Sequence, residues 1–195
     1  THLKLPWSSD AGARGCIVLE PVTALEPQLG PEGYHLTVTP ERVLIQAATA
    51  AGWFYGGISL RQLLPAETFS TKPAAPTPAE WSIPCVEIED HPRFGWRGLL
   101  VDPARHFLPI EFLKRLVDVM ALHKLNTLQL HLTDDQGWRF EIKKYPRLTQ
   151  LGSVRKESPS PGDRNRGDAT PYGPFFYTQE QMRDLVAYAQ ARQVT

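Results

Sequence analysis

The chain has 195 residues, with 21 basic and 21 acidic side chains and a formal net charge of +0. This balance gives no electrostatic attraction for nucleic acid or an anionic membrane, so we expect neither as a partner. Hydrophobic residues make up 42% of the chain, which excludes a disordered protein, and no apolar run reaches the roughly 18 residues of a membrane span.

The start of the sequence carries no targeting signal. It begins at Thr1 without an initiator Met, and no signal-peptide core follows. We therefore expect an internal part of a longer gene product, or a processed form. The sequence does not assign a compartment.

Three short β-prone runs in the first half predict strands, over residues 16–20, 34–38 and 43–47. The turn-forming residues Pro40–Arg42 separate the second run from the third. This order of run, turn and run is typical of a β-hairpin.

A helix and an edge strand are expected to complete this half. Apolar spacing predicts the helix over residues 50–64, and Pro65 ends it. Its glycines weaken a helix by about 1 kcal/mol each, so we expect the helix to lie tightly on a sheet. These glycines are Gly52, Gly56 and Gly57. Residues 65–80 predict a surface connection, and Trp81–Glu89 alternates as an edge strand does, with Pro84 excluding a central one.

The two cysteines, Cys16 and Cys85, form no CxxC motif, which argues against a thiol redox site or a zinc site. They are either two small apolar residues in strands or partners in a disulfide. The first half contains no catalytic constellation. We assign residues 1–92 to a supporting α+β domain.

The second half alternates strands and helices. The apolar run Gly98–Val101 predicts a strand buried on both faces. Helical spacing follows to Leu125, with Pro109 in the first helical position. Residues 127–132 predict a second strand, and Thr178 begins a capping box before a last helix. That helix carries Met182, Leu185, Val186 and Ala189 on one face.

This β-α-β-loop-α order is typical of an α/β fold with a parallel sheet. In such folds the functional residues follow the carboxyl ends of the strands. Neighbouring strands lie about 4.8 Å apart, so Arg105 and Asp134 can converge on one small ligand. The candidates after the first strand are Asp102, Arg105 and His106, and those after the second are His131, Asp134, Asp135 and Trp138.

These residue types suit a sugar. An arginine fork matches vicinal hydroxyls or a carboxylate, an aspartate accepts hydrogen bonds from hydroxyls or orients a histidine, and Trp138 offers a flat apolar face. Other interpretations stay open: Asp134–Gly137 as a plain turn, His131 as a packed structural residue, and Arg105 as a solvated cap. A metal site of His106, His131, Asp134 and Asp135 is a further alternative, without an HxH or HExxH motif.

The long segment from Glu141 to Tyr177 has two interpretations. A structureless stretch of this length is normally functional or disordered. It is either a rim over the sugar site or a mobile surface loop.

Several of these stretches resemble one family. Residues 97–109 (RGLLVDPARHFLP) closely resemble the first barrel strand of the family 20 glycoside hydrolases, the β-N-acetylhexosaminidases. Residues 120–126, 131–139 (HLTDDQGWR) and 176–179 are similar to the same family. In the first half, the WFYGG run that starts at Trp53 is similar to the helix of that family's non-catalytic α+β domain.

The resemblance implies a small α+β domain over 1–92, then the start of a TIM-type (β/α)8 barrel over 93–195. It implies substrates with a terminal β-linked N-acetylglucosamine or N-acetylgalactosamine, no cofactor, and retaining hydrolysis in which the substrate's acetamido oxygen attacks the anomeric carbon. Arg105 matches the arginine that holds sugar hydroxyls. Asp134 matches the aspartate that supports the catalytic acid through a histidine. His131 and Trp138 belong to the same motif, as supporting sugar-site residues.

The chain also departs from the family. The family's adjacent Asp-Glu catalytic pair does not occur in the sequence, nor does the histidine partner of Asp134 after a third strand. A full barrel needs about 250 residues, and residues 93–195 supply about two βα units. Such a part exposes apolar faces and a strand edge, so we expect self-association or the remainder of the barrel as a partner.

Three hypotheses follow. The first is a β-N-acetylhexosaminidase, the second a non-catalytic amino-sugar-binding or assembly protein, and the third an α/β metal hydrolase using His131 and Asp134. The sequence does not assign the aglycone or the choice between gluco and galacto sugars.

Overall fold

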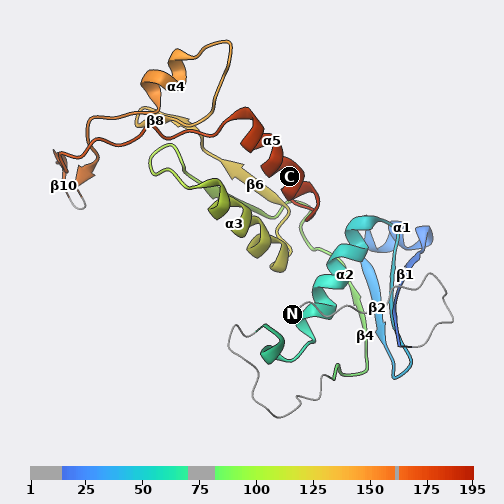
Figure 1. Cartoon of the computed structure of the whole chain (residues 1–195). Coiled ribbons are helices and arrows are strands. Elements are labelled where there is room, and N and C mark those ends of the chain that lie inside the picture. Colours follow the sequence, from blue (N-terminus) through green and yellow to red (C-terminus); the bar gives the residue numbers. More distant parts are fainter. Residues whose placement is uncertain (1–14, 70–81, 161–162) are drawn as a thin grey trace. The chain divides into compact units, whose positions relative to one another are not determined.

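The computed structural model describes residues 15–69, 82–160 and 163–195. The expectations for the start of the chain, for Trp81 and for most of the 65–80 connection lie outside these residues. The chain divides into two compact units, the first ending at Gly95 and the second running from Trp96 to Thr195 (Figure 1). No helix in the described part is long and apolar enough to cross a membrane.

The first unit is built on a four-stranded sheet with the order β1-β3-β2-β4. The strands are β1 (Ile17–Pro21), β2 (Tyr34–Val38), β3 (Val43–Ala47) and β4 (Val86–Asp90). The predicted hairpin is confirmed, because β2 and β3 pair antiparallel, Tyr34 opposite Ala47. The predicted edge strand is confirmed as β4, although it begins only at Val86, beyond Pro84.

Helix α2 (Ala50–Gln62) packs on this sheet and begins at Thr49, whose side chain accepts the N–H groups of Ala51 and Gly52. A Cβ atom on Gly52 would lie 2.4 Å from the carbonyl oxygen of Gly33. One on Gly56 would lie 2.5 Å from Ile45 Cγ2, whereas nothing lies within 4 Å of Gly57. Two of the three glycines therefore permit the expected close packing.

The core under α2 is made by buried side chains of the sheet and the helix. Its largest members are Tyr34, Leu36, Ile45 and Tyr55. Short elements complete the unit: η1 (Thr23–Leu25), α1 (Glu26–Leu29) and η2 (Ala66–Phe69). No disulfide joins Cys16, which is buried, to Cys85, which is exposed. Neither residue lies in a strand, so both interpretations of the pair are wrong.

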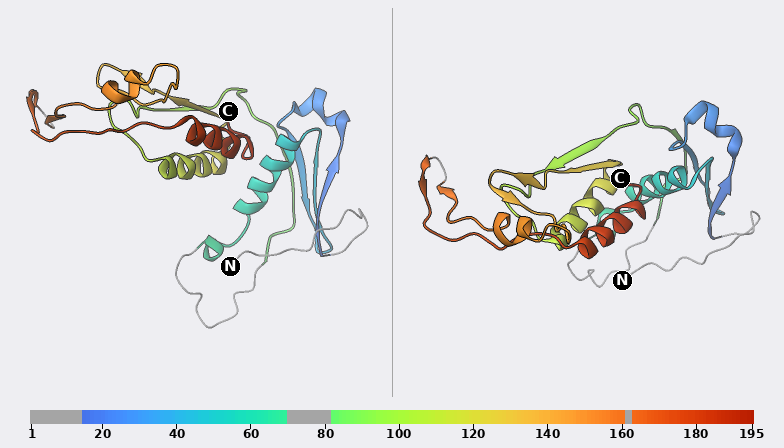
Figure 2. Two further views of the ribbon diagram at one scale, coloured as in Figure 1. Left: turned by 45° about the horizontal axis from the view of Figure 1, so that its top comes forward. Right: turned by 90° about the horizontal axis from the view of Figure 1, so that it is seen from above.

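The second unit has two parallel strands, β5 (Gly98–Val101) and β6 (Thr127–Leu130), with Val101 opposite Leu130. Helices α3 (Ile110–Leu122) and α5 (Gln179–Gln190) run side by side (Figure 2) and share a core with one face of these strands. The fold is thus a small mixed α+β domain followed by part of a (β/α) barrel, and the strands of the described residues form no closed barrel.

Three details of the second unit correct the predictions. Strand β5 is not buried on both faces: Leu100 is 52% exposed, because the described helices cover only the opposite face. Pro109 is the N-cap of α3, in extended conformation, and not its first helical residue. Val186 is 51% exposed, whereas Leu185 and Ala189 of the same helix are buried.

The free edge of β6 carries one further parallel contact. The N–H of Thr195 donates to Asn126 O at 2.9 Å, and the N–H of Leu128 donates to Thr195 O at 2.8 Å. This alternation is the hydrogen-bond pattern of a parallel ladder. The neighbouring Val194 is buried in the core of the unit. Thr195 is thus placed beside β6 as a residue of a neighbouring parallel strand would be.

The segment between β6 and α5 has its own structure. It contains β7 (Thr133–Asp134), β8 (Gly137–Trp138), α4 (Arg147–Gly152), β9 (Pro159–Ser160) and β10 (Asp163–Gly167). Backbone bridges between Phe140 and Tyr177 and between Arg155 and Tyr172 join parts of this segment. The described part of the 141–177 segment therefore has regular structure that the sequence did not predict. The capping box predicted at Thr178 is confirmed.

Candidate functional site

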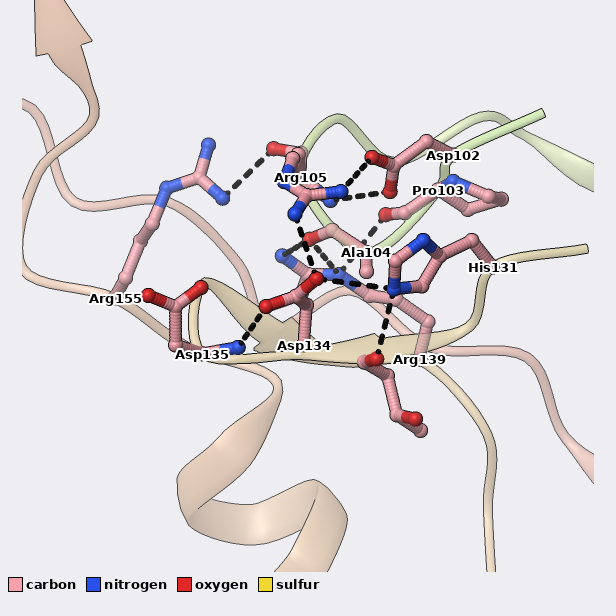
Figure 3. A network of polar contacts seen from close by, with 10 residues as sticks. Asp102, Pro103, Ala104, Arg105, His131, Asp134, Asp135, Arg139 and Arg155 are labelled. Carbon is pink, nitrogen blue, oxygen red and sulfur yellow. Dashed lines mark hydrogen bonds and ion pairs between the residues drawn. The ribbon is translucent and has the colours of Figure 1, made fainter.

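The carboxyl ends of β5 and β6 bring three of the predicted residues into direct contact (Figure 3). One terminal nitrogen of Arg105 donates to Asp102 Oδ2 at 2.5 Å, and the other donates to Asp134 Oδ2 at 2.7 Å. The backbone N–H of Arg105 also donates to Asp102 Oδ1, at 3.1 Å. The guanidinium is thus held between two carboxylates that come from different strands.

Arg105 keeps hydrogen-bonding capacity for a ligand. Its side chain is 52% exposed, whereas Asp102 and Asp134 are 27% and 24% exposed. A guanidinium has five N–H donors in a fixed plane, and each terminal nitrogen uses one of its two on a carboxylate. Donors therefore remain on a half-exposed, oriented arginine.

His131 contacts the same carboxylate as Arg105. Its Nε2 lies 3.0 Å from Asp134 Oδ2 and 3.1 Å from the carbonyl oxygen of Thr133. Because both neighbours are acceptors, we assign the proton to Nε2. The other oxygen of Asp134, Oδ1, accepts the N–H of Asp135 at 2.8 Å. Asp134 therefore has donors on both of its oxygens.

The pKa values of both carboxyls lie below their ordinary range. The pKa of Asp134 is lowered first by its hydrogen bonds from Asp135, and also by the charges of Arg105 and His131. Partial burial acts to raise the pKa of Asp102, but the hydrogen bonds and charge of Arg105 outweigh it and lower that pKa. Both groups are ionised at neutral pH. They can accept hydrogen bonds, but neither can serve as a general acid.

The lowered pKa values of Asp102 and Asp134 predict that the fold becomes less stable in acid. The folded pKa values lie below the ordinary 3.8, so the carboxylate contacts stabilise the fold fully above that value and are lost as the pH falls through the folded pKa values. We expect the urea midpoint to fall with pH in this range, and to fall less steeply in Asp134→Asn. Urea unfolding between neutral pH and about pH 2 measures this. Equal slopes for the parent chain and the variant would contradict it.

The other predicted residues lie outside the arginine–carboxylate contacts. Trp138 pairs with Thr133, and Asp134 pairs with Gly137, so Trp138 and Asp134 lie on opposite faces of the β7–β8 ribbon. The indole N–H of Trp138 donates to Phe140 O at 2.5 Å. Asp135 and His106 are exposed. The structure thus brings Arg105, His131 and Asp134 together, and leaves Trp138 apart from them.

The metal alternative finds no ligand set in the part of the chain that the structure describes. No group of three His, Cys, Asp or Glu side chains there is placed to hold a metal ion. Asp134, which that hypothesis uses, points one oxygen at Arg105 and His131. A guanidinium therefore occupies the place where a cation would approach this carboxylate.

Arg139 is a residue of the site region that the sequence interpretation did not single out. It is fully buried, and its guanidinium donates only to backbone carbonyl oxygens among the described residues. The acceptors are Pro103, Ala104, Gln136, Ser153 and Phe175, at 2.8–3.4 Å. We call these five oxygens the carbonyl cage. It ties the Arg105 loop to the β7–β8 turn.

One local signal for this burial is Gly137. A Cβ atom there would lie 2.3 Å from a terminal nitrogen of Arg139, so only glycine leaves room for the guanidinium. Burial lowers the pKa of Arg139. Tyr172 was also missed, whereas Arg155 belongs to the segment that the sequence suggested as a rim over the sugar site; both contact the Arg105 loop.

Comparison with known families gives two matches. "Glycosyl hydrolase family 20, domain 2" matches residues 1–91, and "Glycosyl hydrolase family 20, catalytic domain" matches residues 94–195. Among curated relatives, a β-hexosaminidase of Porphyromonas gingivalis is 47% identical over 86% of the chain and 20% of its own length. One of Akkermansia muciniphila is 42% identical over 85% of the chain and 30% of its own length.

Solved structures agree with this. The Streptomyces plicatus N-acetyl-β-hexosaminidase in complex with Thio-NAglucal has a TM-score of 0.77 and 36% identity, covering 94% of this chain and 33% of its own. An exo-β-N-acetylglucosaminidase of Vibrio harveyi in complex with N-acetylglucosamine has a TM-score of 0.75 and 37% identity, covering 92% and 26%. The chain spans about a fifth to a third of the length of these relatives.

Proposed function

Because the chain belongs to glycoside hydrolase family 20, we propose that it serves β-N-acetylhexosaminidase chemistry, by providing part of the binding site for a terminal β-linked N-acetylglucosamine or N-acetylgalactosamine. In this proposal residues 93–195 begin the catalytic (β/α)8 domain and residues 1–92 form the supporting domain. The remaining barrel strands, or a second copy of the chain, cover its exposed apolar face. No cofactor is needed for this chemistry.

The observation that carries the proposal is the orientation of Arg105. Its guanidinium is held by Asp102 and Asp134 while half of the side chain stays exposed. A planar fork with spare donors suits two neighbouring hydroxyl groups. The flanking carboxylates can accept hydrogen bonds from the same sugar. Arg105 would hold the sugar hydroxyls, with Asp134 and His131 in supporting roles beside it. Trp138 would support the site only from the opposite face of the β7–β8 ribbon.

The reaction also needs a group that these contacts do not provide. When the acetamido oxygen attacks the anomeric carbon, the bond to the leaving oxygen breaks and that oxygen takes a proton from a general acid. Asp102 and Asp134 have lowered pKa values, so they do not hold that proton at neutral pH. The sequence contains no adjacent Asp-Glu pair. We therefore assign sugar binding, and not proton transfer, to the described residues.

The test is an amide NMR titration of the chain with N-acetylglucosamine, with glucose as the control sugar. We expect shifts confined to residues 102–106 and 131–135, and shifts at the same residues with glucose, because the hydroxyls that Arg105 would hold are common to both sugars. A folded chain whose site amides do not respond at saturating sugar would overturn the proposal.

A hydrolysis assay separates the alternatives. With an aryl β-N-acetylglucosaminide we expect binding without turnover by this chain, because the general acid is missing. Turnover that is lost in Arg105→Ala would mean that the chain or its self-assembly supplies a catalytic carboxyl, and our assignment would be wrong. Stable folding without sugar binding would favour the assembly protein.

A further inference from the structure

Arg155 contacts the backbone of the residue that the proposed function depends on. One terminal nitrogen of Arg155 donates to the carbonyl oxygen of Arg105 at 2.9 Å and, more weakly, to that of Gln136 at 3.4 Å. Its Nε and its second terminal nitrogen donate to Ser158 Oγ at 3.0 and 2.8 Å. Figure 3 shows Arg155 reaching the Arg105 carbonyl from a different segment of the chain.

Tyr172 contacts the same loop two residues further on. Its hydroxyl oxygen accepts the N–H of Phe107 at 2.7 Å. The ring of Tyr172 lies under the guanidinium of Arg155, 3.8 Å from ring centroid to Cζ. The two residues also exchange backbone hydrogen bonds, each of 2.9 Å. Arg155 and Tyr172 therefore form one unit that holds residues 105 and 107, on both sides of His106.

We infer that Arg155 and Tyr172 are positioning residues for Arg105. The inference rests on the proposed function, in which Arg105 binds the sugar. The carbonyl of Arg105 is bound by Arg155 and its N–H by Asp102, so both peptide groups of this residue are fixed. A long, half-exposed side chain keeps one orientation more readily when its backbone cannot rotate, and preorganisation of this kind strengthens binding.

A purely structural role explains the contacts less well. Neither Arg155 nor Tyr172 belongs to the buried core of the unit, which is formed by residues of α3 and α5 together with Tyr177 and Val194. The side-chain hydrogen bonds of Arg155 outside its own turn go to Arg105 and Gln136, which lie in the two segments that carry the site. Arg155 and Tyr172 thus link the 141–177 segment to Arg105, the arginine that would bind the sugar.

The first experiment needs no ligand. The Asp102 carboxyl is faced by Arg105 and His131, and its pKa reports whether Arg105 stays in contact. We expect Arg155→Met to raise the pKa of Asp102 towards its ordinary value in a carboxyl ¹³C NMR titration. The matched control is Arg192→Met, which removes a guanidinium stacked 3.5 Å over Tyr188. An unchanged Asp102 pKa in Arg155→Met would overturn the inference.

A second variant covers the case in which Arg155→Met does not fold. Tyr172→Phe keeps the ring under Arg155 but removes the acceptor of the Phe107 N–H. We expect faster hydrogen exchange of the Phe107 amide and a smaller rise in the pKa of Asp102. Unchanged values for both would also overturn the inference.

The sugar titration then tests the consequence for binding. We expect Arg155→Met to weaken N-acetylglucosamine binding about tenfold, because Arg105 would have to be ordered on binding, and Arg192→Met to leave it unchanged. A parent chain that binds no sugar would refute the proposed function alone. The Asp102 titration would still decide whether Arg155 positions Arg105.

Discussion

Replacing Arg139 by methionine is expected to lower the free energy of unfolding of the Trp96–Thr195 unit by about 4 kcal/mol. Among the described residues, three carbonyls of the carbonyl cage have no hydrogen-bond donor other than Arg139: those of Pro103, Ala104 and Phe175. A buried acceptor left without a donor costs about 1–3 kcal/mol. Methionine fills much of the space but donates nothing, so these costs add.

Hydrogen exchange followed by mass spectrometry can measure this loss in one unit at a time, because peptides from α3 and α5 report on the second unit alone. The control is Arg192→Met, a partly exposed arginine paired with Asp118, for which we expect a loss of about 1 kcal/mol or less. Equal protection of α3 and α5 in the parent chain and in Arg139→Met would show that the carbonyl cage does not stabilise the fold.

Arg105→Met is expected to weaken N-acetylglucosamine binding by about 100-fold or more. Two hydrogen bonds from a charged group contribute roughly 3 kcal/mol together, which corresponds to a factor of over 100 in Kd. The variant also leaves Asp102 and Asp134 without the cation between them. Both carboxylates then lose the partner that orients them.

The measurement is the same amide NMR titration, with two comparison variants. Arg105→Lys keeps the charge but loses the planar fork, so we expect an intermediate loss. Lys114→Met removes a cation of α3 that pairs with Asp184, and we expect no effect on sugar binding. If Arg105→Met binds the sugar as tightly as the parent chain, Arg105 does not hold it.

Much of the fold was predictable from local patterns. The alternation of β2 and β3 and the turn between them predicted the hairpin, and the capping box predicted the start of α5. Topology alone predicted the meeting of Arg105 and Asp134, because both follow the carboxyl ends of neighbouring parallel strands. The prediction for β5 failed because burial depends on what covers a strand. The apolar run indicates that both faces of β5 need to be covered by other parts of a protein. The described part of this chain covers only one of them.

The residues that hold the site in place were harder to predict. Arg139 donates hydrogen bonds to backbone oxygens. Every residue has such an oxygen, so no residue type in the sequence marks which ones accept. Its five acceptors come from four places along the chain, at residues 103–104, 136, 153 and 175. Arg155 and Tyr172 lie in a stretch rich in glycine, proline and serine, where no periodicity indicates an ordered contact. Their pairing depends on chain geometry between α4 and α5.

The carbonyl cage is in effect a binding site for a guanidinium ion. In the parent chain this site is filled by the guanidinium group of Arg139. If the side chain were cut back to alanine, free guanidinium could enter the emptied site and bind the native state. A ligand that binds only the native state stabilises it in proportion to its concentration. Guanidinium chloride would then act on such a variant first as a ligand and only at higher concentration as a denaturant, whereas urea, which is uncharged, would act only as a denaturant.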